Sequence, residues 1–301
     1  MSVFDDLVDH ALRNQQELMA LRNVVEKEIL HHDILREMAA ADLLQQLTFI
    51  GGTCLRACYG SNRLSEDLDF TGGTDFDPSQ LSQLKQTLEG RLQQKYQLPI
   101  SVSEPKATKQ GNVDTWKLRV NTRPERPDLP AQRIHIDICA VPSYQPMPRT
   151  LRSAYAIDLG TETLIVNAQS REEIFVDKLV AFGMRPGRLK YRDIWDIAWL
   201  TQNGITPALE LLESKLADHD HSTNEFLSRT GKRLSDLDSS EHKQAFRFEI
   251  ARFISPERLA ETLRQDGFWT YLIHTVTEQV RQAQAYLGNP PSPDDEPQFR
   301  M

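Results

Sequence analysis

Apolar side chains in the first 45 residues recur every three or four positions from Leu18 to Met38, which is the spacing of an α-helix. No alternating apolar and polar run, the mark of a strand, interrupts them. We therefore expect a helical lead over residues 1–45. His31 and His32 lie within it, and adjacent residues of a helix do not share one face well. Both histidines are expected at the surface.

The middle of the chain mixes strand and helix patterns. A helix should begin at Asp77-Pro78, an N-cap followed by proline at the first helical position, and carry a buried stripe of leucines. Two of the strands flank a Pro-rich turn and are expected to pair as a hairpin. The predicted strands are 47–50, 100–103, 116–121, 134–140 and a brief one at 164–166, with a helix over 54–59 and a connector over 144–150.

The pattern becomes helical again after Ser170, which with Glu173 forms a capping box and places a helix start at residue 171. This helix is expected to stop at Gly183, a second helix to cover 191–202, and further helices to reach about Leu287. The predicted fold is α+β (α/β), with N-terminal helices, a mixed sheet and a mostly helical C-terminal half. We expect domains at 1–168 and 169–287, and a Pro-rich, acidic, disordered tail at 288–301.

Composition excludes few classes of protein. Hydrophobic residues make up 39% and charged residues 26% of the 301, as in an ordinary globular protein. No apolar run reaches the 18 or so residues of a membrane span, and the acidic N-terminus resembles no secretory signal. The odd count of three cysteines suits a reducing cytoplasm, where we expect the protein. The net charge of −8 disfavours non-specific coating of nucleic acid, yet a local basic patch can still bind RNA.

The most informative chemistry lies between Phe49 and Thr71, where Gly51-Gly52 follows a predicted strand and Asp67-Leu68-Asp69 closes the segment. Alternate residues of a strand share a face, so both carboxylates should point the same way. Two adjacent carboxylates suit a cation such as Mg²⁺. Paired glycines let backbone N–H groups approach a phosphate. Either feature alone is commonly a turn or a solvated strand end; together they indicate nucleotidyl transfer.

This stretch resembles the first motif of the AbiEii/MenT-type toxins of type IV toxin–antitoxin systems, within the DNA polymerase β-like nucleotidyltransferase superfamily. The motif reads GGT-x-L-R and then R-x-S-x-D-[LI]-D-[FL]. The resemblance implies two metal-binding carboxylates, Asp67 and Asp69, and a set of nucleotide-binding residues, namely Gly51, Gly52, Thr53, Arg63 and Ser65.

A site of this superfamily needs a third carboxylate on a neighbouring strand. Asp137 stands in the strand-like run RIHIDICAVP, where an aspartate lowers strand propensity and needs a reason. It could be a polar residue on an edge strand. The resemblance favours it instead as the third metal ligand.

A second block, residues 171–200, is similar to the family's E-x-x-x-x-K and [KR]-x-R-D-x-x-D-[IL] motifs. Lys178 interrupts an apolar helix stripe, so its ammonium either reaches the edge of the stripe or meets an anion. The resemblance implies that Lys178 binds nucleotide and that Asp193, beside Asp196, organises the site or acts as a base. The basic residues nearby could line a solvated face or bind RNA: Arg185, Arg188, Lys190 and Arg192.

The resemblance implies an enzyme that uses Mg²⁺ or Mn²⁺ and an NTP, with catalytic residues Asp67, Asp69, Lys178 and Asp193. The expected acceptor is the 3′ end of tRNA, and the expected effect is growth inhibition, countered by a cognate antitoxin that need not touch the toxin. No membrane partner is expected. Two alternatives stay open: nucleotidylation of a protein or small molecule, and a nucleotide-binding module without turnover.

Overall fold

The structure, a computed structural model, describes residues 2–106, 111–126 and 128–289. Its chain forms two compact units. The first comprises Met1–Ser170 with Ala251–Glu261, and the second comprises Arg171–Ile250 with Thr262–Met301. Apart from Gly288 and Asn289, the tail expected at 288–301 lies outside the described residues.

The N-terminal helical lead is confirmed as α1 (Val3–Asn14), the 3-10 helix η1 (Gln16–Leu21) and α2 (Arg22–Ala40). α2 carries apolar side chains around its whole circumference, and such a helix is buried on every side. His31 and His32 are consequently buried, at 2% and 5% exposure. The expectation that they lie at the surface is wrong, because the polar residues of α2 stand between apolar ones around the helix.

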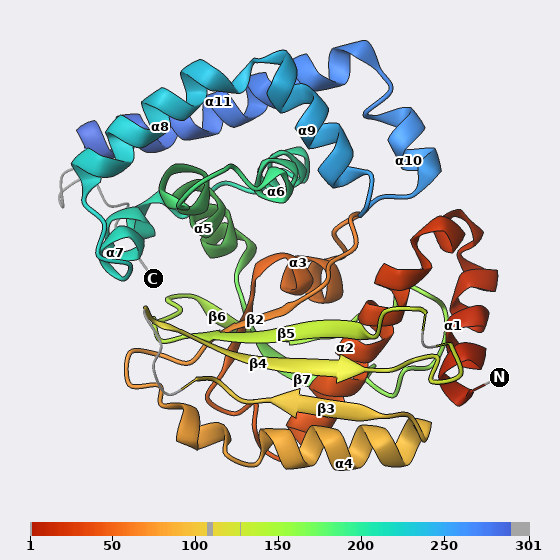
Figure 1. Ribbon diagram of the computed structural model, residues 1–301. Coiled ribbons are helices and arrows are strands. Elements are labelled where there is room, and N and C mark those ends of the chain that lie inside the picture. Colours follow the sequence, from red (N-terminus) through yellow and green to blue (C-terminus); the bar gives the residue numbers. More distant parts are fainter. Residues whose placement is uncertain (1, 107–110, 127, 290–301) are drawn as a thin grey trace, which may run out of the picture. The chain divides into compact units, whose positions relative to one another are not determined.

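The core of the first unit is a seven-stranded mixed sheet in the described residues, with the order β3-β4-β5-β2-β1-β7-β6. β4 and β5 pair antiparallel, as the predicted hairpin requires. β5 also pairs with β2, in parallel, so β5 is an inner strand (Figure 1). The strands are β1 (Thr48–Ile50), β2 (Leu68–Thr71), β3 (Ile100–Ser103), β4 (Val113–Val120), β5 (Gln132–Cys139), β6 (Pro146–Thr150) and β7 (Ile165–Gln169).

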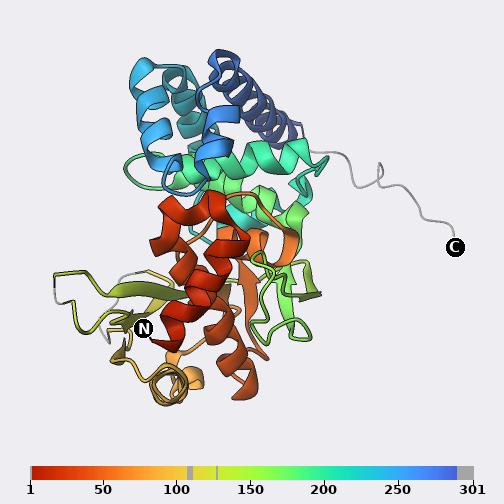
Figure 2. The same cartoon turned by 90° about the vertical axis from the view of Figure 1, so that its right-hand side faces the viewer.

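Helices cover this sheet in the first unit. α3 (Gly51–Tyr59) packs on β1, β2 and β7, whereas α2 packs on β5 and on α4 (Leu84–Tyr96). Figure 1 shows α2 running behind the sheet, and Figure 2 turns α1 and α2 toward the viewer. The predicted leucine stripe on α4 is buried, as expected, after Asp77 caps the 3-10 helix η2 (Pro78–Leu81).

The segment 144–150, expected to be a connector, contains the strand β6 instead. Its two prolines, Pro146 and Pro148, lack the N–H group that an inner strand needs. β6 pairs only with β7 and stands at the end of the strand order, a position where proline is tolerated. The sequence expectation was wrong because prolines exclude inner strands and not edge strands.

In its described residues, the second unit is helical from α5 (Arg171–Met184) onward. α5 continues through Gly183, so the expected stop there is wrong. A Cβ on Gly183 would lie 2.7 Å from Thr230 Cγ2 and 2.9 Å from Phe226 of α8; this glycine allows two helices to approach closely. The other helices are α6 (Tyr191–Gln202), η3 (Leu209–Leu211), α7 (Leu212–Ala217), α8 (Thr223–Leu237), α9 (Ser240–Ile250) and α11 (Asp266–Gly288), while α10 (Pro256–Glu261) belongs to the first unit.

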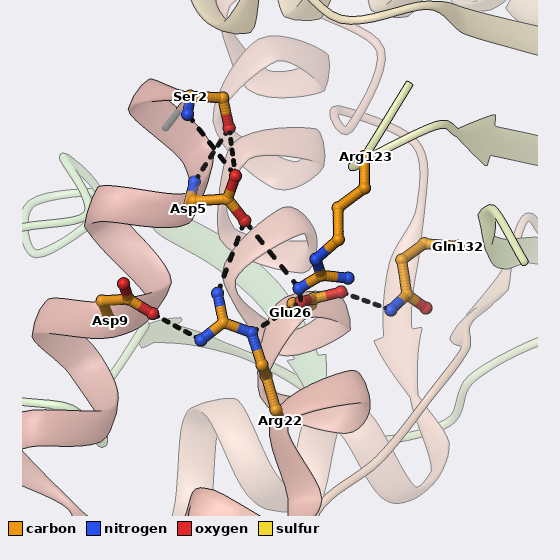
Figure 3. A network of polar contacts seen from close by, with 7 residues as sticks. All are labelled: Ser2, Asp5, Asp9, Arg22, Glu26, Arg123 and Gln132. Carbon is orange, nitrogen blue, oxygen red and sulfur yellow. Dashed lines mark hydrogen bonds and ion pairs between the residues drawn. The ribbon is translucent and has the colours of Figure 1, made fainter. Parts of the chain in front are cut away.

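A buried ion network joins α1, α2 and the β4–β5 hairpin (Figure 3). The fully buried carboxylate of Glu26 accepts hydrogen bonds from Arg22 at 3.1 Å, from Gln132 at 2.6 Å and from Arg123. These donors compensate the cost of burying the charge. In the described part of the chain, no helix has the length and apolar character to cross a bilayer.

Candidate active site

The candidate carboxylates lie at the centre of the sheet of the first unit. Asp69 of β2 and Asp137 of β5 are register partners on neighbouring parallel strands, so their side chains leave the same face side by side. Leu68 and Phe70, on either side of Asp69, are buried at 0% and 1% exposure. Since β5 is an inner strand, the alternative that Asp137 is an edge-strand residue is wrong.

Asp67 stands one residue before β2 and lies opposite His135 of β5. Its Oδ1 accepts a hydrogen bond from the His135 backbone N–H at 3.1 Å and lies 3.4 Å from His135 Nδ1. Asp137 Oδ1 accepts a hydrogen bond from the Thr115 hydroxyl at 2.6 Å. These hydrogen bonds orient one carboxylate oxygen of Asp67 and one of Asp137.

Gly51 and Gly52 are the first two residues of α3, which begins three residues earlier than the sequence predicts. Gly51 has φ +76°, and a Cβ at this position would lie 2.8 Å from Asp69 Oδ2. A Cβ on Gly52 would overlap the guanidinium of Arg63. Both glycines therefore permit close approach, and the Asp69 carboxylate lies at the N-terminus of α3, where backbone N–H groups attract anions.

The side chains of Thr53 in α3 and Ser65 before Asp67 are buried, and their hydroxyl groups lie close together. They are 2.8 Å apart, and the Thr53 hydroxyl also donates to the carbonyl oxygen of Asp67. Exposure is 2% for Thr53 and 6% for Ser65. In the structure these two residues fix the turn before Asp67, and their expected contact with phosphate stays a prediction.

The type of the donor atoms, rather than their spacing in this structure, suits a hard divalent cation. Asp67, Asp69 and Asp137 offer carboxylate oxygens, the ligands that Mg²⁺ prefers, and a cation would reduce the repulsion between Asp69 and a phosphate bound at the same helix end. Among the described residues, no three acidic, histidine or cysteine side chains converge closely enough to form a complete metal centre.

Two residues that the sequence did not suggest hold the turn before Asp67. Glu28 accepts a hydrogen bond from the backbone N–H of Ser65 at 3.0 Å, and His31 Nε2 donates to the carbonyl oxygen of Glu66 at 3.0 Å. Burial lowers the pKa of His31 from 6.5 to about 3 and that of His32 to about 4, so both rings are neutral at pH 7. The apolar circumference of α2 was the signal that its polar residues are buried.

In the second unit, Lys178 of α5 meets two carboxylates of α6. Its Nζ lies 2.8 Å from Asp193 Oδ1 and 2.9 Å from Asp196 Oδ2, and Asp193 also pairs with Arg185 at 3.1 Å. The Lys178 and Asp196 side chains are only 11% and 0% exposed. Lys178 therefore meets anions, as its position in an apolar stripe predicts, and in the structure these anions are two aspartates. Triphosphate binding by Lys178 stays a prediction.

The predicted RNA-binding residues have different environments. Arg188 and Lys190 are exposed, whereas Arg185 pairs with Asp193, and Arg192 lies 3.7 Å from Glu249. Arg123, on the hairpin loop, is bound to Glu26 in the network of Figure 3 and is thus engaged within the protein. Solvent-facing positive charge in this block is thus carried by Arg188 and Lys190.

Comparison with known proteins bears first on the fold. The search of curated proteins finds no match. Among solved structures, the chain is similar to MenT4, a nucleotidyltransferase toxin from Mycobacterium tuberculosis H37Rv, with TM-score 0.55 and 16% identity over 95% of this chain and 91% of that one. It also resembles JHP933 from Helicobacter pylori, with TM-score 0.47 and 18% identity over 87% and 94%.

The model of one protein family matches residues 33–272, most of the chain, and is described as the nucleotidyl transferase AbiEii toxin of a type IV toxin–antitoxin system. The match spans the glycines of α3, the three central carboxylates and the Lys178 cluster. This chain therefore belongs to the AbiEii family of nucleotidyltransferase toxins.

Proposed function

We propose that this nucleotidyltransferase transfers a nucleoside monophosphate from an NTP to RNA, at the 3′ end of tRNA, with Mg²⁺ or Mn²⁺ as cofactor. The observation that carries the proposal is the register of Asp69 and Asp137 on adjacent strands, with Asp69 against Gly51 at the N-terminus of α3. This geometry combines a phosphate-binding helix end with carboxylates able to hold a cation.

In this proposal each part of the site has a chemical task. Asp67, Asp69 and Asp137 hold the divalent ion, which when bound neutralises charge on the phosphates and assists attack by the acceptor hydroxyl. The backbone N–H groups of Gly51 and Gly52 bind phosphate oxygens. The acceptor hydroxyl attacks the α-phosphate in line, its proton leaves to solvent or a carboxylate, and pyrophosphate departs.

The residues of the second unit supply the remaining contacts. We assign Lys178 to the nucleotide, with Asp193 organising its ammonium, and Arg188 and Lys190 to acceptor phosphates, assisted by Arg185 and Arg192. Blocking the acceptor end of tRNA would stop aminoacylation and growth in the cytoplasm. A cognate antitoxin, encoded beside the toxin, would counter this effect.

Two alternatives have different acceptors or none. The first is nucleotidylation of a protein or a small molecule, and the second is a nucleotide-binding module without turnover. The intact set of three central carboxylates favours turnover, since binding alone would not require them. The exposed positive charge of Arg188 and Lys190 favours RNA over a neutral small molecule.

The test is to measure NTP binding and to incubate the purified chain with each α-labelled NTP and either total RNA or a cell extract, with Mg²⁺, with Mn²⁺ and with a chelator. We expect labelled tRNA only when the metal is present. Asp69→Asn, which keeps the side-chain shape, should lower the rate by about 100-fold or more. Asp75→Asn, an exposed aspartate of the same unit, is the matched control and should leave the rate unchanged.

The acceptor is identified in the same experiment. Label found in protein rather than in RNA would show that the acceptor is a protein and not tRNA. Binding of NTP without any label in RNA, protein or small molecules would favour the module without turnover. An Asp69→Asn variant with the wild-type rate would contradict the assignment of the central carboxylates.

A further inference from the structure

The turn that leads into Asp67 has no regular backbone structure. Residues 64–67 lie between α3 and β2 without helix or strand hydrogen bonds, so the position of Asp67 depends on contacts from elsewhere. One is a backbone hydrogen bond from Leu64 N–H to the carbonyl oxygen of Phe253, at 2.7 Å. His135 of β5 donates its backbone N–H to the Asp67 carboxylate at 3.1 Å, and Arg63 donates to the Leu64 carbonyl oxygen at 3.1 Å. Further contacts come from side chains of α3 and α2.

α2 binds this turn through consecutive helical turns. Glu28 accepts from Ser65 N–H at 3.0 Å, and His31, three residues later, donates to the Glu66 carbonyl at 3.0 Å. Lys27 adds an ion pair with the Glu66 side chain at 2.8 Å. Residues three and four apart lie on one face of a helix, so one face of α2 holds both residues that precede Asp67, Ser65 and Glu66.

Glu28 also connects the turn to α3. Its carboxylate accepts from Arg56 Nε, with 3.2 Å to Oε2, and from the Tyr155 hydroxyl. Arg56 belongs to the helix that begins at Gly51. One buried carboxylate is therefore shared by the phosphate-binding helix and the turn that carries Asp67, and it fixes the distance between them.

We propose that Glu28 and His31 are positioning residues for nucleotidyl transfer, holding Asp67 in its place through Ser65 and Glu66. This inference rests on the proposed function. Neither residue touches the reacting atoms. Their effect is geometric, because a displacement of about 1 Å in a group that acts on the substrate can cost about 100-fold in rate.

His31 and His32 provide a matched pair of variants. They are adjacent, both are buried, and each makes one hydrogen bond: His31 to the motif turn, and His32 to the Thr161 hydroxyl at 2.7 Å, in a loop outside the motif. His31→Met and His32→Met each remove one hydrogen bond and fill the space of the ring with an apolar side chain of similar size. They should lower the melting temperature to a similar extent.

Catalysis should separate the two variants. We expect His31→Met to lower kcat by about 10-fold or more, with the KM for the NTP within about 2-fold of wild type, whereas His32→Met should keep the wild-type kcat per folded molecule. His31→Gln, whose amide N–H can still reach the Glu66 carbonyl, should recover most of the lost rate. Glu28→Gln is the second variant if His31→Met does not fold, and it should likewise lower kcat.

Amide hydrogen exchange supplies a readout independent of activity. His31→Met should speed exchange in residues 64–69, and His32→Met should speed it near Thr161 instead. Equal kcat values for His31→Met and His32→Met, or unchanged exchange in 64–69, would overturn the positioning role. If wild type transfers no nucleotide, the proposed function fails, while the exchange result still decides whether α2 fixes the turn.

Discussion

Lys178 shows at the scale of single residues how the structure changes an expectation. From the sequence, the loss of Lys178 is expected to lower activity by orders of magnitude without a comparable drop in melting temperature. In the structure its ammonium neutralises two carboxylates that are almost completely buried. Removing one partner of a buried ion group commonly costs about 3–5 kcal/mol, so Lys178→Met should lower the free energy of unfolding as well, as measured by urea denaturation.

A double variant separates the two effects. Adding Asp196→Asn removes the buried charge that Lys178 neutralises, while Asp193 keeps Arg185 at 3.1 Å, and stability should largely return. Lys215→Met is the control for the loss of a buried lysine, since Lys215 Nζ likewise lies 2.5 Å from a Glu173 oxygen and 3.1 Å from an Asp177 oxygen. It should lower stability without lowering activity per folded molecule. If the stable double variant regains full activity, Lys178 is structural and does not bind the nucleotide.

The buried histidines of α2 predict how stability depends on pH. Folding lowers the pKa of His31 to about 3 and of His32 to about 4, because burial disfavours the charged ring. Below pH 6.5 the unfolded chain therefore binds more protons than the folded one. As the pH is lowered from 6.5, the free energy of unfolding should therefore fall by up to about 1.4 kcal/mol per pH unit for each histidine.

Urea denaturation at pH 7, 6 and 5 measures this slope, in a range where most carboxylates stay ionised. His31→Met and His32→Met should each flatten it by about half. A wild-type free energy of unfolding that does not change from pH 7 to 5 would contradict the burial of both rings in neutral form.

Candidate residues at this scale could be found in the sequence, but their partners could not. Asp67, Asp69 and Asp137 stand out because carboxylates interrupt apolar strands. The register that places Asp69 beside Asp137 joins strands 68 residues apart, and no local pattern specifies such a parallel pairing. Glu28 and His31 were missed because their importance comes from the turn they contact.

At the scale of elements, Gly183 marks a close contact between α5 and α8 rather than a helix end. Gly183→Ala should lower the free energy of unfolding by about 1–3 kcal/mol, since the added methyl would press against Thr230 and Phe226. Gly231→Ala, inside α8 with no atom within 4 Å of the new Cβ, should raise it by about 0.5–1 kcal/mol. Thermal and urea unfolding would measure both, and similar shifts for the two would contradict the packing role.

Most elements could be predicted, and the errors share a cause. Periodicity identified the helical lead, the leucine stripe of α4 and the β4–β5 hairpin. Glycine and proline were interpreted as breaks at Gly183, Pro146 and Pro148. Their effect depends on what lies beside them: a neighbouring helix at Gly183, and an open sheet edge at β6.

At the scale of the whole molecule, the proposed binding of RNA must overcome a net charge of −8. Arg188 and Lys190 are exposed, so Arg188→Gln with Lys190→Gln should weaken RNA binding and reduce its logarithmic salt slope by about 1.5 units, while NTP binding changes little. Neutralising Lys232 and Arg264, both exposed in the same unit, is the control. The affinity for RNA, measured across a salt titration, tests whether Arg188 and Lys190 contact RNA phosphates. Equal losses of RNA affinity in both double variants would indicate only a general charge effect.

The path of the chain has a consequence for the toxin's synthesis. Residues 251–261 return to the first unit after the helices of the second have begun, and Phe253 supplies the carbonyl that holds Leu64 in the turn before Asp67. A ribosome must therefore translate the whole segment from α5 to α9, which precedes Phe253, before this contact can form. Nascent chains without this segment lack a complete motif turn, so the toxin's site matures after the helices from α5 to α9 have been made.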